Sequence, residues 1–161
     1  MISIVRFSSQ KEQVIRLLIE LQEHLVSADN ENVQILLKDY GEKYYHHVMN
    51  LLEGNEGVAF LALEGKDIVG MVAGYIEPKD EEDTITTRCP KRGVVSELVV
   101  SAPFRERSIG KSLVDAIETY FFEKECEFVA VDVFAPNVDA QKFYNSLGYS
   151  PRNIELYKRI R

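Results

Sequence analysis

A stretch of basic residues interrupts an acidic chain of 161 residues with a net charge of −7. Six basic and two acidic side chains fall between residues 88 and 111, and Arg105, Arg107 and Lys111 of this stretch flank Gly110. The pattern there changes from strand to helix. The first amides of a helix lack intrahelical acceptors and lie at its positive end, so they can cradle a phosphate or pyrophosphate. The stretch predicts an anion site or, alternatively, a basic helix cap. Neither a Walker motif nor a dinucleotide fingerprint is present.

The elements that must position this stretch follow from the hydrophobic periodicity. The first half predicts a strand near residues 2–7, a helix over 10–26 that opens with a capping box between Ser9 and Glu12, and a helical region over 31–53 interrupted near Gly41. The second half predicts strands, helices and connections in this order: strand 58–63, hairpin turn 65–67, strand 68–76, exposed acidic connection 77–83, strand 93–100, helix 110–122, strand 128–134, helix 139–147 and strand 154–160. The nearly continuous apolar character of 128–134 favours a central strand.

The order β-α-α-β-β-β-α-β-α-β predicts an α/β or α+β fold with a mixed sheet, in a single domain over residues 1–161. Its later half contains a βαβ unit over 94–134.

Composition narrows the function classes. An apolar fraction of 45% and a charged fraction of 28% are typical of a soluble globular protein, and the longest apolar run, 58–63, is too short to span a membrane. Cys89 and Cys126 are too few for a disulfide scaffold or a structural zinc site, so we expect no metal and a cytoplasmic location. The acidic charge argues against nucleic-acid binding.

Two sequence blocks resemble the GNAT superfamily of N-acetyltransferases. Residues 98–100 and 104–113 resemble its acetyl-CoA signature, a strand followed by [QR]-x-x-G-x-[GA], with Arg105 and Gly110 at the ends and Ser108 where the first glycine is usual. The second block, N-x-x-A-x-x-[FL]-Y-x-x-x-G-[FY], is similar to Asn137 through Tyr149. The resemblance covers essentially the whole chain and implies a mixed, mostly antiparallel sheet flanked by helices.

The resemblance implies acetyl-CoA as cosubstrate and a set of residues that hold it. The strand 98–100, including Val99, would splay from its neighbour, so that the amides of Leu98 and Val100 bind the pantetheine and the thioester carbonyl. The pyrophosphate would lie on the helix start, and Asn137 and Tyr144 come from the second block. The implied pyrophosphate-binding residues are Arg105, Arg107, Ser108, Ile109, Gly110, Lys111 and Ser112. If Ser108 needs a positive φ, it weakens binding relative to glycine.

Three side chains are candidates for proton transfer during acyl transfer. Tyr144 stands where the family places the acid that protonates the leaving thiolate, although a core aromatic is the alternative. Glu97, on the signature strand, and Asp132, which interrupts the apolar run 128–134, are candidate bases for the amine. Either carboxylate could instead be an ordinary salt-bridge partner. Tyr40, Tyr44 and Tyr45 could line an acceptor pocket or pack in the core.

The leading hypothesis is an acetyl-CoA-dependent N-acetyltransferase that acts on a primary amine by direct attack in a ternary complex. The acidic surface favours a small polyamine-like or aminoglycoside-like acceptor over a protein or peptide amine. A CoA-binding regulatory module without turnover is the rival, and analogy with the family raises the expectation of a homodimer.

Overall fold

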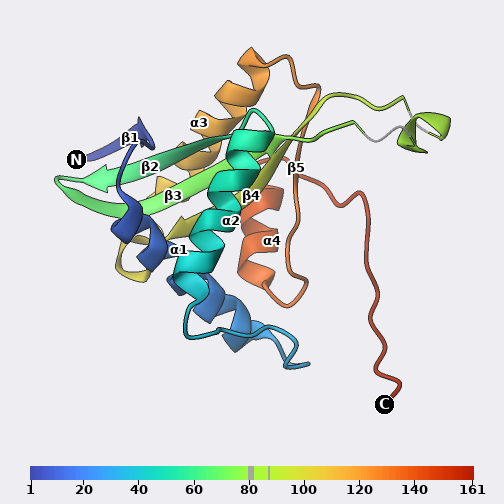
Figure 1. Cartoon of the computed structure of the whole chain (residues 1–161), viewed down its shortest axis with the longest axis horizontal. Coiled ribbons are helices and arrows are strands. Elements are labelled where there is room, and N and C mark those ends of the chain that lie inside the picture. Colours follow the sequence, from blue (N-terminus) through green and yellow to red (C-terminus); the bar gives the residue numbers. More distant parts are fainter. Residues whose placement is uncertain (80–81, 87) are drawn as a thin grey trace.

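A five-stranded sheet separates two layers of helices in the computed structural model (Figure 1), which describes residues 1–79, 82–86 and 88–161. The spatial order of its strands equals their order in the chain: β1 (Ile2–Arg6), β2 (Val58–Glu64), β3 (Asp67–Ile76), β4 (Arg92–Val100) and β5 (Phe128–Val131). The first four strands pair antiparallel, and β4 and β5 pair parallel. The prediction of a mixed, mostly antiparallel sheet is therefore confirmed.

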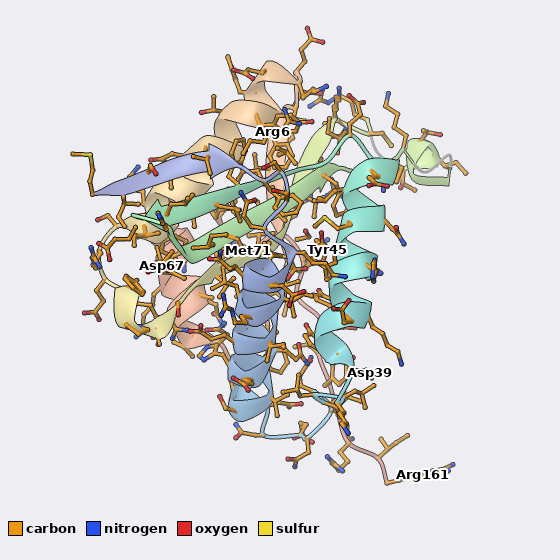
Figure 2. The ribbon with its side chains drawn as sticks, turned by 60° about the vertical axis from the view of Figure 1, so that its left-hand side comes forward. Arg6, Asp39, Tyr45, Asp67, Met71 and Arg161 are labelled. Carbon is orange, nitrogen blue, oxygen red and sulfur yellow. The ribbon has the colours of Figure 1, made fainter. Side chains whose placement is uncertain are left out.

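Helices cover both faces of the sheet. The helices α1 (Lys11–Ala28) and α2 (Tyr40–Gly54) pack on one face around Leu18, Leu61 and Met71, whereas α3 (Ile109–Glu123) packs on the other around Ile117 and Phe121. Figure 2 shows Met71 on the sheet beside α1. The remaining elements are α4 (Val138–Ser146) and two short 3-10 helices, η1 (Glu82–Ile85) and η2 (Ala102–Phe104). No helix of the described residues is long and apolar enough to cross a membrane.

The predicted hairpin and βαβ unit are both present. Gly65 has a φ of +65° in the turn between β2 and β3, which a glycine adopts without steric cost. The helix α3 connects β4 to the parallel strand β5, as the βαβ pattern predicts. The predicted acidic connection lies partly outside the described residues, at 80 and 81. In the described part, Glu77 is half-buried and accepts two 2.5 Å hydrogen bonds from Arg92.

The first half differs from its prediction at both helix starts. The predicted capping box is wrong, because Gln10 is the N-cap of α1 and its side-chain oxygen accepts hydrogen bonds from the amides before it. The predicted helix over 31–39 is also absent. The buried Asp29 carboxylate accepts the amides of Glu31, Val33 and Gln34 at 2.6–2.9 Å, which holds this segment as a loop.

Gly41 does not interrupt a helix but lies within α2, where it permits a close helix contact. A Cβ atom at this position would lie 2.7 Å from Cγ2 of Ile15 and 2.9 Å from Cδ1 of Ile19. These distances are too short for any side chain, so the glycine lets α2 approach α1. The predicted interruption of the helix at Gly41 is therefore wrong, and the glycine instead allows α2 to pack closely on α1.

Two predictions about the last strands are wrong. The strand β5 ends at Val131, not at residue 134, and lies at the edge of the sheet with Phe128 54% exposed. Val129 and Val131 pack against the core on the α3 face, whereas Phe128 is exposed, so the apolar run does not mark a central strand. Residues 154–160 form no strand and are exposed throughout. The described sheet therefore lacks the closing strand of the predicted order.

Candidate active site

The pairing between β4 and β5 ends halfway along β4 and leaves the rest of that edge of β4 unpaired in the described chain; we call this unpaired edge the gap. Only Arg92–Val95 of β4 pair with β5, so Ser96–Val100 have no strand partner on that side among the described residues. The Ser101 amide donates to the Val69 oxygen on the opposite side, toward β3. Because alternate residues of an antiparallel strand point to opposite neighbours, the amides of Leu98 and Val100 are turned toward the gap. The Val100 oxygen also faces away from β3, since it accepts a 3.0 Å hydrogen bond from Arg105 Nε.

A bulge in β4 determines which way Glu97 points. Ala73 of β3 pairs with Glu97 and Gly74 pairs with Val95, which leaves Ser96 without a partner on β3. The extra residue reverses the alternation of side chains. Val95 therefore packs on the α3 face, whereas Glu97 points to the α1–α2 face and contacts α2.

Glu97 is the buried carboxylate of this site. It is 5% exposed, and its Oε1 accepts a 2.7 Å hydrogen bond from the Tyr44 hydroxyl. Burial raises the pKa of Glu97 to about 7, and the hydrogen bond from Tyr44 partly offsets this rise by stabilising the carboxylate. A carboxyl group that titrates near neutral pH is suited to accept a proton.

Tyrosines from two helices surround this carboxylate. Burial and the charge of Glu97 together raise the pKa values of Tyr40 and Tyr44 on α2 and of Tyr144 on α4. The rings of Tyr40 and Tyr44 are stacked, with centroids 5.0 Å apart. The charge of Glu97 thus acts on Tyr40 and Tyr44, whereas the Tyr45 ring faces Lys11 of α1.

The Tyr144 hydroxyl is available for interaction with a ligand. Tyr144 is 7% exposed, and its hydroxyl makes no hydrogen bond with the described part of the chain. Within that part, no fully enclosed side-chain nitrogen or oxygen lacks a partner, so this hydroxyl must retain contact with solvent. A reachable donor next to Glu97 is what the role of general acid requires.

The loop from β4 into α3 presents a run of unpaired amides. The backbone amides of residues 106–111 donate no hydrogen bond to the described chain, and they lie at the positive end of α3. Ser108 is the N-cap of α3 with a φ of +59°, the left-handed conformation that glycine adopts freely. Ile109 is buried, and the Phe143 ring covers Gly110 at 3.3 Å from where a Cβ would lie.

The basic side chains of this loop are each paired with a carboxylate. Arg105 lies 3.7 Å from Glu20, Arg107 binds Glu64, and Lys111 lies 2.7 Å from Asp115. The three basic side chains are exposed, although Glu20 and Glu64 are partly buried, so each basic side chain can exchange its carboxylate for another anion. Ser112 Oγ donates to the Ser108 oxygen at 3.3 Å.

Two further predicted residues have local roles in the structure. The Asn137 side-chain oxygen accepts the Ala140 amide at 3.2 Å and so caps α4, and it lies 3.5 Å from His24 Nε2. The predicted position of Asp132 in mid-strand is wrong, because β5 ends before it and its side chain is exposed. Its charge contributes to the raised pKa of Tyr75, after burial and Glu77. Asp132 is therefore not among the groups that surround Glu97.

The structure adds Glu20 to the residues found by sequence reasoning. Its carboxylate accepts the Ser101 hydroxyl at 2.8 Å and the Ala102 amide at 2.7 Å, which fixes the loop to α1. The helical pattern gave no signal for it, because Glu20 lies off the apolar face of α1 that Val14, Leu17 and Leu18 form. No group of three metal-ligating side chains occurs in the described ranges.

Comparison with known proteins identifies the family. The sequence model described as "Acetyltransferase (GNAT) family" matches residues 19–149. Human N-alpha-acetyltransferase 30 is 25% identical over 118 residues, which cover 73% of this chain and 31% of that protein. An uncharacterised N-acetyltransferase of Methanocaldococcus jannaschii is 29% identical over 89 residues, 55% of this chain and 52% of that protein. The chain thus spans about a third to a half of the length of these relatives.

A putative acetyl transferase from Pyrococcus furiosus shares the fold, with a TM-score of 0.75 and 22% identity over 99% of this chain and all of the other. The structure of AAC(6')-Iy in complex with a bisubstrate analogue, CoA-S-monomethyl-acetylneamine, aligns with a TM-score of 0.70 and 17% identity, covering 100% and 99% of the two chains. Since the family model covers most of the sequence and the fold agrees, the chain belongs to the GNAT acetyltransferase family.

Proposed function

We propose that this chain is an acetyl-CoA-dependent N-acetyltransferase in which Glu97 accepts a proton from the amine and Tyr144 donates one to the leaving group. The observation that carries this proposal is the position of Glu97. It is a buried carboxylate on the strand that borders the gap, it accepts a hydrogen bond from Tyr44, and its charge contributes to the raised pKa of Tyr144.

The fit to acetyl-CoA rests on donors that the fold leaves unpaired. The amides of residues 106–111 are suited to a pyrophosphate, and the exposed side chains of Arg107 and Lys111 can leave their carboxylate partners for it. Along β4, the amides of Leu98 and Val100 face the gap and can bind the pantetheine arm and the thioester oxygen. When bound, acetyl-CoA supplies an acetyl group on a thioester, whose carbon–sulfur bond breaks as the carbon–nitrogen bond forms.

Glu97 acts as the general base that removes the proton of the acceptor amine. An amine attacks only when neutral, and an alkyl amine with a pKa of about 10.4 is almost wholly protonated at neutral pH. The Glu97 carboxylate takes this proton, directly or through one water molecule. Because burial brings its pKa to about 7, a large share of Glu97 is ionised at neutral pH, yet it is a stronger base than an ordinary carboxylate.

Tyr144 supplies the second proton, to the sulfur of the leaving group. Burial and the negative charge of Glu97 both hold its pKa above the usual value, so Tyr144 is protonated before the reaction. When Glu97 takes up the proton of the amine, its charge disappears and with it the second cause of the raised pKa. Proton uptake at Glu97 therefore makes Tyr144 a better acid at the moment when the thiolate leaves.

The acceptor is a primary amine, and two classes are supported. A small cationic amine is favoured by the net charge of −7. One solved neighbour, represented by two structures, is titled an aminoglycoside acetyltransferase. A peptide α-amine is favoured by the relatives named N-alpha-acetyltransferase 30, and because its pKa of about 7.7–8.0 is close to that of Glu97.

The test is a thiol-release assay with acetyl-CoA and a panel of polyamines, aminoglycosides and short peptides, run with the wild type, Tyr144→Phe and Tyr120→Phe. We expect release with at least one amine class, and a fall in kcat of about 100-fold in Tyr144→Phe, within the range for loss of a general acid. Tyr120→Phe is the matched control, because the Tyr120 hydroxyl binds the Glu56 backbone oxygen away from the site.

Two outcomes would contradict the proposal. CoA binding in calorimetry without release for any amine would indicate a binding module without turnover. Full activity of Tyr144→Phe would remove Tyr144 from the role of acid while leaving the transferase assignment in place.

A further inference from the structure

The end of α4 turns the chain back against the last turn of the helix. The Gly148 amide donates to the Asn145 oxygen at 3.1 Å. The Tyr149 amide donates to the Tyr144 oxygen, also at 3.1 Å. These are the two bonds of a Schellman motif, and Gly148 has the positive φ, +91°, that the motif requires. In this motif the residue after the glycine packs against the last turn of the helix, so the turn brings the Tyr149 side chain to Tyr144.

The rings of Tyr144 and Tyr149 are in edge-to-face contact. Their centroids are 5.2 Å apart, and the angle between their planes is 65°. The Phe143 ring makes a second contact of this kind with Tyr144, at 5.2 Å and 70°. Because the Tyr144 hydroxyl makes no hydrogen bond with the described part of the chain, packing against its neighbours, and not a polar partner, sets the orientation of its ring.

Tyr149 is itself fixed to α3 by its hydroxyl. The hydroxyl donates a 2.7 Å hydrogen bond to Oε1 of Glu118, and both side chains are half-buried. Burial, this bond and the charge of Glu118 raise the pKa of Tyr149, so its hydroxyl keeps the proton that it donates. Asp115, one turn earlier on α3, pairs with Lys111. No basic side chain of the described residues pairs with Glu118, so its carboxylate holds the Tyr149 hydroxyl.

The helix α3 is also the element proposed to hold the pyrophosphate of acetyl-CoA. Its first turn contains Gly110, where the Phe143 ring lies 3.3 Å from the place of a Cβ atom. Glu118 lies in the second half of the same helix. The segment from Phe143 to Tyr149 thus contacts α3 at two separate points. Tyr144 lies between them and keeps a fixed position relative to the helix that would hold the cosubstrate.

We propose that Tyr149 is a positioning residue for acetyl transfer: its ring, with the hydroxyl held by Glu118, keeps Tyr144 in the orientation from which Tyr144 protonates the leaving thiolate. This inference rests on the proposed function, in which Tyr144 is the general acid. The proton passes from the Tyr144 hydroxyl to the sulfur, while Tyr149 keeps its own proton in the bond to Glu118.

A positioning role has a kinetic consequence. An acid acts only within hydrogen-bond reach of the group that it protonates, and a misplacement of about 1 Å can cost about 100-fold in rate. Loss of the support from Tyr149 should therefore lower kcat. The binding of acetyl-CoA, which is proposed to rest on β4 and the start of α3, should stay unchanged.

The first test measures kcat and the KM for acetyl-CoA with an amine that the wild type acetylates. Tyr149→Phe keeps the ring and loses the bond to Glu118, so we expect kcat to fall by about 10-fold, with KM changed by less than about 2-fold. Glu118→Ala should have the same effect, whereas Glu118→Gln, which keeps an acceptor oxygen, should retain most of the wild-type kcat. The matched control is Glu123→Gln, an exposed carboxylate at the end of α3, which should change neither constant.

A double-mutant cycle separates positioning from a structural role. In the Tyr144→Phe background, Tyr149→Phe should lower kcat no further, because no acid is left to position. An equal fall in both backgrounds would overturn the positioning role and leave the proposed function in place. Full kcat of Tyr149→Phe beside an impaired Tyr144→Phe would do the same. Full kcat of Tyr144→Phe would overturn both proposals.

The second test needs no turnover. The tyrosine rings are labelled with a stable carbon isotope, and the NMR signal of Tyr144 is identified as the one missing from Tyr144→Phe. Glu118→Ala and Tyr149→Phe both leave the two ring contacts of Tyr144 possible. Each should nevertheless shift or broaden the Tyr144 signal, with and without bound CoA, whereas Glu123→Gln should not. An unchanged Tyr144 signal in either variant would show that the bond to Glu118 does not act on the acid, and would contradict the proposal.

Discussion

The Tyr44 hydroxyl on α2 donates a 2.7 Å hydrogen bond to Oε1 of Glu97, which is buried on β4 at the border of the gap. The two residues are 53 positions apart in the sequence. The pair joins the helix expected to face the acceptor to the strand expected to face acetyl-CoA. Two opposing effects act on one carboxyl group there, since burial favours its neutral form and the tyrosine favours its charged form.

Replacing Tyr44 with phenylalanine should raise the pKa of Glu97 above about 7, because burial then acts without the opposing hydrogen bond. A bond to a charged group is worth about 1.5–3 kcal/mol, so the acidic limb of the kcat/KM profile should move up by about one to two pH units. Titratable groups that face Glu97 are Tyr40 and Tyr44 from α2 and Tyr144 from α4. Tyr45→Phe is the control on the same helix, and an unmoved limb in Tyr44→Phe would contradict the coupling.

Replacing Glu97 with glutamine should stabilise the fold above neutral pH. The carboxyl has a pKa of about 7 in the folded state and 4.5 as reference, so the native state binds more protons between these values and stability falls as pH rises. The loss of folding stability is complete above pH 7 and amounts to about 3 kcal/mol in the free energy of unfolding. Urea unfolding should be measured for both proteins at pH 4.5 and at pH 8. The free energy of unfolding of Glu97→Gln, relative to that of the wild type, should be higher at pH 8 than at pH 4.5. A pH-independent difference would show that Glu97 is not strained by burial.

Local sequence patterns were sufficient for most elements of the fold. The hairpin at Gly65 and the βαβ unit were predicted because turn residues and periodicity act over a few positions. The loop after Ala28 was missed, since it depends on the buried Asp29 carboxylate and three amides, a contact that no periodicity reveals. The edge position of β5 was missed because a continuous apolar run does not say whether its outer side is covered.

The candidate site could be predicted only in part, because some of its features depend on contacts between residues far apart in the sequence. The two blocks that carry the family resemblance predicted Glu97 and Tyr144 as candidates, whereas the orientation of Glu97 depends on the bulge at Ser96 and the exposure of Asp132 on the end of β5 at Val131. A bulge inserts one residue and turns the side chain to the other face. Sequence alternation alone cannot place such a residue. Glu20 could not be found from the helical pattern, because it lies off the apolar face of α1 and its partners Ser101 and Ala102 are distant in the sequence.

Replacing Ser108 with glycine should stabilise the chain. A serine in the left-handed conformation costs about 1–2 kcal/mol, and glycine loses about 0.5–1 kcal/mol through the unfolded state, so the net gain is between about 0 and 1.5 kcal/mol. The melting temperature should rise by about 2–4 °C. Ser112→Gly, one turn later within α3, should lower it instead. Ser108→Ala keeps the strain and removes the hydroxyl, so a rise in that variant would contradict a backbone origin.

Replacing Glu20 with alanine should weaken CoA binding without touching any residue of the α3 start. The Glu20 carboxylate holds Ser101 and Ala102, and through the 3.7 Å contact with Arg105 it also orders the first residue of the signature. Loss of two hydrogen bonds to a partly buried carboxylate should cost about 1–3 kcal/mol of stability. Without Glu20 the loop is less ordered, and CoA binding must then order it. The dissociation constant for CoA in calorimetry should therefore rise by about 10-fold, the equivalent of 1.4 kcal/mol. Glu23→Ala, an exposed position on the same helix, is the control and should change neither quantity. Reduced stability with unchanged CoA affinity would restrict Glu20 to holding the fold, and unchanged stability would show that the loop is fixed from the β4 side alone.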